Sequence, residues 1–149
     1  MNPHAFTQPW IDAWRDELVA SEEFRAAGAR WQGAIAFVMT PEPELGMPDE
    51  RCAWLDLRNG DCRAARSATP EDRATAPFVL RAPASTWERL LLGELEPIWA
   101  LMGGKLQLDR GTITRLVPHA RMARQLVRAS RRANERFEPR VDDDLGEEG

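Results

Sequence analysis

Side chains of the types that perform catalysis are few in this chain, and their spacing matches no catalytic motif. The two histidines, His4 and His119, do not provide a multi-histidine metal site or a zinc site of two cysteines and two histidines. His119 lies near the edge of an apolar helical stripe, where we expect a partly buried, hydrogen-bonded structural residue. Cys62 would act as a nucleophile only with His119 beside it, and no local pattern requires that. We therefore predict no catalytic residue, no metal ligand, no cofactor and no enzymatic activity.

The run Gly103-Gly104-Lys105 has some likeness to a phosphate-binding loop, but it fails at both ends of that motif. Trp99 stands where the first glycine belongs, and Leu106 replaces the serine or threonine that would bind magnesium. We interpret the two glycines as the end of a helix, where the chain reverses into a strand.

Length and composition are those of an ordinary globular protein. The chain has 149 residues, enough for one domain with a substantial core, and 43% of them are hydrophobic and 30% charged. No apolar run approaches the roughly 20 residues of a membrane-spanning helix, and residues 1–8 lack the pattern of a secretion signal. We expect a cytoplasmic protein in which Cys52 and Cys62 are packing residues with free thiols.

Hydrophobic periodicity predicts two N-terminal helices within residues 1–30. Trp10, Trp14 and Leu18 recur at helical spacing, and Ser21 is a typical N-cap for a second helix that ends at Gly28. We expect both helices to pack against the rest of the domain.

Strands follow these helices. Residues 30–40 alternate with apolar side chains on both faces, so both sides of the sheet should be covered. Asn59-Gly60 predicts a two-residue hairpin turn. In that register Cys62 faces Leu57 and Cys52 faces Ser67, which directs the two thiols to opposite faces of the sheet. Residues 69–73 are interpreted as a polar turn and residues 78–80 as a further strand.

After Pro83 the pattern becomes helical, because Ser85 and Glu88 match a capping box ahead of an apolar face. A second short helix and an alternating strand over residues 105–109 follow, and a long amphipathic helix ends the series. Strands and helices are grouped rather than alternating. The order predicts an α+β domain with a mostly antiparallel five-stranded sheet, covered on one main face by helices.

The segment 78–127 carries a resemblance to a known family. A Trp87-led helix and Gly93 come first, then a short helix, Met102-Gly103-Gly104-Lys105, the strand Lys105-Leu106-Gln107-Leu108, and Gly111 before the last helix. In this order the chain resembles the SCP2 family of sterol carrier protein-2-like lipid-binding domains, from residue 31 to about 132. The resemblance implies a domain over residues 31–133, which follows the helices expected within 1–30. The acidic composition near the end predicts a disordered tail over 134–149, in which the chain departs from the family pattern.

The resemblance also implies an apolar cavity between sheet and helices that holds a lipid, sterol, fatty-acyl or other hydrophobic molecule, as a carrier or presenter. Lys105, Gln107 or Arg81 could meet a polar head group. A filled core built from the same residues is the alternative, and periodicity alone does not separate the two. The apolar side chains expected to line the cavity are Phe78, Leu80, Trp87, Leu91, Ile98, Leu101, Met102, Leu106, Leu108, Ile113, Leu116 and Val117.

The last helix has a basic face opposite its apolar stripe. Five arginines lie within an arc of about 100° on a helical wheel, and the sequence ends in an acidic segment. This face could make transient contact with an anionic membrane surface, whereas specific nucleic-acid binding is not expected because no aromatic residues interleave with the arginines. The alternative function is a non-catalytic module that binds a partner protein or an anionic surface through this helix, and a homodimer is possible. The arginines are Arg121, Arg124, Arg128, Arg131 and Arg132.

Overall fold

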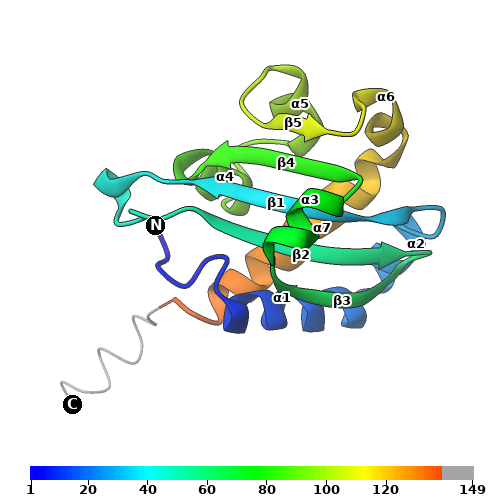
Figure 1. The fold of residues 1–149 in the computed structure, drawn as a ribbon. Coiled ribbons are helices and arrows are strands. Elements are labelled where there is room, and N and C mark those ends of the chain that lie inside the picture. The colour runs from blue at the N-terminus through cyan, green and yellow to red at the C-terminus, as the bar shows by residue number, and fades with distance from the viewer. Residues whose placement is uncertain (139–149) are drawn as a thin grey trace, which may run out of the picture.

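Five strands form one sheet in the spatial order β3-β2-β1-β4-β5 (Figure 1). In chain order they are β1 (Gln32–Thr40), β2 (Arg51–Arg58), β3 (Asp61–Ser67), β4 (Phe78–Pro83) and β5 (Gln107–Arg110). Neighbouring strands are antiparallel except β1 and β4, which run parallel. This computed structural model describes residues 1–138, and it confirms the predicted α+β fold with a mostly antiparallel five-stranded sheet.

The β2–β3 hairpin turns at Asn59-Gly60, where both residues have positive φ angles of 52° and 83°. Cys62 pairs with Leu57 as predicted, but a bulge beside Leu57 shifts the register by one residue. Ser67 therefore faces Ala53, and the predicted pairing of Cys52 with Ser67 is wrong.

The two thiols still lie on opposite faces of the sheet, because Cys52 and Leu57 are five positions apart on β2. Cys62 is buried in the main core, while Cys52 packs on a smaller cluster that includes Val38 and Val79. Both cysteines are free.

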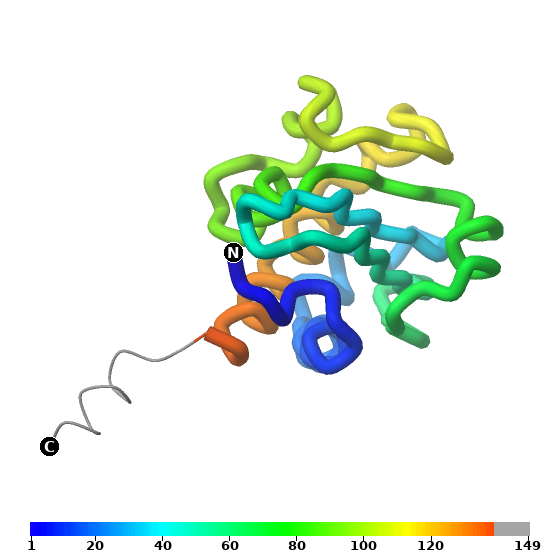
Figure 2. Tube along the Cα trace, turned by 60° about the vertical axis from the view of Figure 1, so that its left-hand side comes forward, coloured from blue at the N-terminus to red at the C-terminus, as the bar shows by residue number. Residues whose placement is uncertain are grey.

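Most helices cover one face of the sheet (Figures 1 and 2). α1 (Gln8–Ala20) lies beside α7 (Ala120–Glu135), and both contribute to the main core. α2 (Glu22–Ala27) begins at Ser21, whose side chain accepts a hydrogen bond from Phe24 N, and ends at Gly28 as predicted. α4 (Ala84–Leu91) follows β4 and also packs against α7.

One helix lies on the opposite face. α3 (Pro70–Thr75) covers the apolar side chains of Ala36 and Val38, so both sides of β1 are buried as expected. Its residues were predicted to be a polar turn, which is wrong. Thr69 and Asp72 form a reciprocal capping box that starts this helix, and Arg66 pairs with Asp72 at 2.7 Å.

Short helices make up the remaining connections. η1 (Pro43–Leu45) lies between β1 and β2, and α5 (Pro97–Met102), α6 (Ile113–Leu116) and η2 (Val117–His119) lie around β5. Gly104, with φ +79°, ends α5 as predicted. The predicted capping box at Ser85 is absent, because α4 begins at Ala84 and Ser85 donates from its backbone N–H and its hydroxyl to Glu42 Oε1.

Side chains of α1 occupy the outer edge of β3. Arg15 donates to the carbonyl oxygens of Cys62 and Arg63 at 3.1 and 3.0 Å, and the Ser67 N–H donates to Gln8 Oε1 at 2.7 Å. Arg63 is itself the bulged residue of β3, since Cys62 and Ala64 pair with the consecutive residues Leu57 and Asp56 of β2. The edge strand is therefore partnered by a helix.

Candidate ligand-binding site

A cavity of about 70 Å³ lies between the sheet and the helices of the main face. β1 and β4 supply its floor, and α1, α4, α5, α6, η2 and α7 supply its walls. Phe6, ahead of α1, and Leu106, ahead of β5, complete the lining. The lining residues are nearly all apolar: Phe6, Trp10, Trp14, Ile35, Phe37, Leu80, Trp87, Leu90, Leu91, Pro97, Ile98, Leu101, Leu106, Leu116, His119, Met122, Ala123, Leu126, Val127 and Ser130.

Five of these side chains form a closed ring of aromatic contacts. Phe6 contacts Trp10 (5.4 Å between ring centroids), Trp10 contacts Trp14 (5.5 Å), and Trp14 contacts Phe37 (5.1 Å). Trp87 completes the ring through Phe37 at 6.2 Å and Phe6 at 5.4 Å. Such tilted and edge-on pairs hold aromatic rings in fixed positions. The ring joins the N-terminal segment, α1, the sheet and α4, and all five side chains line the cavity.

The indole N–H groups of this ring all have protein acceptors. Trp10 donates to Asn134 Oδ1 at 3.1 Å, Trp14 to the Leu126 carbonyl at 3.0 Å and Trp87 to the Val38 carbonyl at 3.0 Å. Because these N–H groups are satisfied, the tryptophans offer the cavity only their carbon surfaces.

Two lining side chains besides the tryptophans carry nitrogen or oxygen atoms. The Ser130 hydroxyl donates to the carbonyl of Val127 at 2.6 Å. His119 is half-buried, with its ring edge-on to Trp31 at 4.9 Å. The contact found for His119 is therefore aromatic, whereas a hydrogen-bonded histidine was expected.

Seven of the twelve apolar residues predicted to line a cavity do so, and five lie elsewhere. Phe78 is buried behind the wall against Trp31, and Leu108 is partly buried on the edge strand β5. Met102, Ile113 and Val117 are 59%, 41% and 42% exposed. The residues that line the cavity as predicted are Leu80, Trp87, Leu91, Ile98, Leu101, Leu106 and Leu116.

The position of a residue around the helix axis explains why Met102 on α5 was wrongly predicted to line the cavity. Ile98 and Leu101 are three positions apart and share the inward face of α5, whereas Met102 follows 100° further round and points to solvent. The sequence analysis did not predict that Phe6, Trp10 and Trp14 line the cavity. The helical spacing of Trp10 and Trp14 was recognised, but the elements that they pack against were not predicted.

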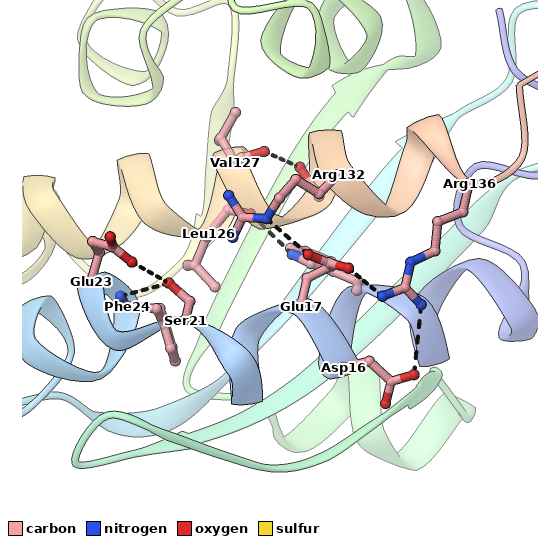
Figure 3. Close-up of polar contacts among 11 residues, drawn as sticks. Asp16, Glu17, Ser21, Glu23, Phe24, Leu126, Val127, Arg132 and Arg136 are labelled. Carbon is pink, nitrogen blue, oxygen red and sulfur yellow. Dashed lines mark hydrogen bonds and ion pairs between the residues drawn. The ribbon is translucent and has the colours of Figure 1, made fainter.

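Arginines at the C-terminal end of α7 pair with α1 (Figure 3). Arg132 pairs with Glu17 at 2.9 Å, and Arg136 also pairs with Glu17. Burial alone would raise the pKa of Glu17, but hydrogen bonds from these two arginines outweigh it and hold the pKa below its usual value. Arg131 turns away from the basic face and donates to the Leu91 carbonyl at 2.9 Å.

The other three arginines border an open groove of about 400 Å³ between α2 and α7. Arg121, Arg124 and Arg128 are exposed and have no ion-pair partner within residues 1–138. The predicted acidic tail falls largely on residues 139–149, outside the described residues.

The groups considered for a ligand head group or for catalysis do not meet at the cavity. Arg81 pairs with Asp109 at 2.8 Å and with Gln107, and Lys105 is exposed. Burial raises the pKa of the Cys62 thiol to about 12, and Cys62 is not among the lining residues. Within residues 1–138 no three His, Cys, Asp or Glu side chains gather as potential metal ligands.

Comparison with known proteins places these features in a family. The model of the SCP-2 sterol transfer family matches residues 13–110. A crystal structure of sterol carrier protein 2 is 41% identical, with a TM-score of 0.77 over 85% of this chain and 97% of its own. A conserved hypothetical protein from Thermus thermophilus, described as possibly a sterol carrier protein, is also 41% identical, with a TM-score of 0.76 over 86% and 88% of the two chains.

A more distant structure shares the fold. Sterol carrier protein 2 from Yarrowia lipolytica, in its apo form, is 17% identical with a TM-score of 0.55 over 81% of this chain and 88% of its own. No match was found among curated proteins. No helix within residues 1–138 combines the length and apolarity needed to cross a bilayer.

Proposed function

The chain belongs to the SCP-2 sterol transfer family, and we propose that it binds a lipid or similar hydrophobic molecule in the cavity that the aromatic ring helps to line. The observation that carries the proposal is the apolar cavity itself: all five aromatic side chains of the ring line it, and the indole N–H groups among them are already satisfied. A packed core would have filled that space, because protein interiors leave few voids larger than a water molecule.

The size of the cavity implies that ligand entry enlarges it. About 70 Å³ is well below the roughly 300–1,000 Å³ of sites that enclose small organic molecules. α5 and α6 are the elements best suited to move, since they have six and four residues and expose Trp99, Met102 and Ile113 to solvent. We propose that their outward displacement admits the ligand.

The energetics favour exchange over permanent storage. Burying a chain of about ten methylene groups contributes about 8 kcal/mol at roughly 0.8 kcal/mol each, while association and the opening of the wall cost several kcal/mol. A micromolar dissociation constant needs a net gain of about 8.2 kcal/mol, so binding weaker than micromolar follows. This supports a carrier or presenter rather than a store.

Native mass spectrometry of the purified protein, followed by lipid extraction, tests the proposal. Titration with fatty acids and sterols should also change the tryptophan fluorescence. The chain offers matched variants: Trp87→Phe alters the cavity wall, whereas Trp99→Phe alters a side chain that is 69% exposed. The Trp87 variant should lose more of the ligand-induced change. If no apolar molecule is retained and no titration alters the fluorescence, the proposal is wrong.

A second candidate function rests on the groove between α2 and α7. Arg121, Arg124 and Arg128 could dock on an anionic membrane surface or on an acidic partner protein, mainly through charge. Docking on a membrane would suit lipid exchange. The attraction should weaken as salt rises, because exposed charges are screened.

Flotation with phosphatidylserine-containing vesicles tests this second function. Replacement of the three groove arginines by glutamine should reduce low-salt binding, while Arg30→Gln, at an exposed position on another segment, should not. A chain without residues 141–149 should bind more strongly, because five acidic groups are removed. Absence of binding by both lengths at low salt would rule out membrane docking.

A further inference from the structure

One side chain of the cavity wall has polar atoms that no other residue of the described range, 1–138, engages. The indole N–H groups of the aromatic ring and the Ser130 hydroxyl all donate to protein acceptors. Among the described residues, no hydrogen bond involves the side chain of His119. His119 is therefore the lining residue with free hydrogen-bonding capacity.

The imidazole of His119 lies where the cavity meets the surface. Within residues 1–138 every fully buried side-chain nitrogen or oxygen has a hydrogen-bond partner. Since the His119 nitrogens have none, they are not fully buried, and the residue as a whole is half-buried. One part of the ring thus borders the apolar space while its nitrogens reach toward solvent.

Neighbouring residues hold this ring in place. His119 ends η2 immediately before α7, and its ring is edge-on to Trp31 at an interplanar angle of 82°. Trp31 is fixed in turn, because its indole N–H donates to the Gly33 carbonyl at 2.9 Å and its ring packs on Phe78 at 4.9 Å. A donor held in this way does not have to be ordered when a ligand arrives.

We propose that His119 is the specificity-determining residue of the cavity, and that it donates a hydrogen bond to a single terminal oxygen of an otherwise apolar ligand. The inference rests on the proposed ligand-binding function. The ligand body would occupy the apolar cavity, against the aromatic ring, and its carboxylate or hydroxyl oxygen would stay at the mouth beside the imidazole. A molecule with further polar groups along its body would leave them unpaired among carbon atoms, which is costly.

Binding of three compounds of equal chain length tests the inference: dodecanoic acid, 1-dodecanol and dodecane. The quenching of tryptophan fluorescence gives their affinities for the wild type and for His119→Leu, His119→Gln and His4→Leu. His4 is the matched control, since it packs on Phe137 at 5.3 Å and is not among the lining residues. Thermal unfolding establishes that each variant is folded.

The wild type should prefer the acid and the alcohol to dodecane. His119→Leu should weaken the acid and the alcohol about tenfold and leave dodecane unchanged, while His119→Gln, which keeps an N–H donor, should retain most of the preference. His4→Leu should match the wild type. The inference is overturned if the wild type binds all three alike, or if His119→Leu keeps the preference. If none of the three compounds binds the wild type, the proposed function fails together with the inference.

Discussion

Filling the cavity should stabilise the protein and weaken ligand binding, two effects that a packed core would not produce together. Ala123 is half-buried on α7 and lines the cavity. Ala123→Leu adds three carbon atoms at a position where both residues favour a helix. A void of about 70 Å³ costs about 1.7 kcal/mol at roughly 24 cal/mol per Å³. That figure is the upper limit of what the substitution can recover.

Urea denaturation measures the effect on the free energy of unfolding. Ala123→Leu should raise it by up to about 1.7 kcal/mol, which corresponds to about 2–4 °C in Tm per kcal/mol for a chain of this length. The affinity for dodecanoic acid should fall at least tenfold, because the side chain occupies the space that the ligand needs. Thermal stabilisation by added ligand should shrink accordingly.

Ala129→Leu is the matched control on the same helix. Ala129 is fully buried in the main core but does not line the cavity. The larger side chain should therefore overpack the core and lower the free energy of unfolding by about 1–3 kcal/mol. If Ala123→Leu destabilises the protein as much as Ala129→Leu does and leaves ligand affinity unchanged, the space is not a binding cavity and our reasoning is refuted.

Three further predictions concern stability and reactivity. Glu17→Gln should lower the free energy of unfolding at pH 7 by about 1 kcal/mol, because an uncharged amide pairs less well with the arginines of α7. The folded-state pKa of Glu17 is lowered, so its contribution is present above its ordinary pKa and lost as pH falls through the folded value; the wild type and the variant should converge in acid denaturation. Gly60→Ala should destabilise by about 1–3 kcal/mol in urea, since φ is +83° and the added Cβ would lie 2.3 Å from the Arg25 carbonyl oxygen; equal stability would contradict the turn geometry. Cys62 and Cys52, whose pKa values burial raises to about 12 and about 11, should react slowly with iodoacetamide at pH 8 until the protein unfolds, and rapid labelling of the folded protein would contradict their environment.

Sequence patterns predicted which segments form strands and helices better than they predicted which residues of those segments pair or pack together. The alternation in β1 and the Asn59-Gly60 turn specify the strands and the hairpin, because both signals are local. The bulge beside Leu57 has no signal in the turn residues, and the register beyond it was therefore predicted wrongly. Arg15 of α1 donates to the carbonyl oxygens of Cys62 and Arg63 at this bulge. α3 was missed although Thr69 and Asp72 form a capping box with Pro70 at the first helical position, a signal that was available.

In the candidate site, too, residues with a local helical signal were predicted and residues placed by long-range contacts were not. Leu91, Ile98 and Leu101 were predicted because each lies on the apolar face of a helix. Trp10 and Trp14 were recognised as helical core residues, but their part in the cavity wall depends on contacts with Phe37 and the distant α7. Long-range packing of this kind leaves no periodic trace in the sequence.

The contacts that α1 makes with β3 bear on the tendency of the protein to aggregate. An edge strand with open backbone groups can recruit the edge of another molecule and start β-type aggregation. Arg15 and Gln8 occupy three of those groups on β3, so α1 acts as a guard against intermolecular sheet extension as well as a wall of the cavity. Detachment of this helix would therefore expose an unpaired edge strand and an apolar cavity at the same time.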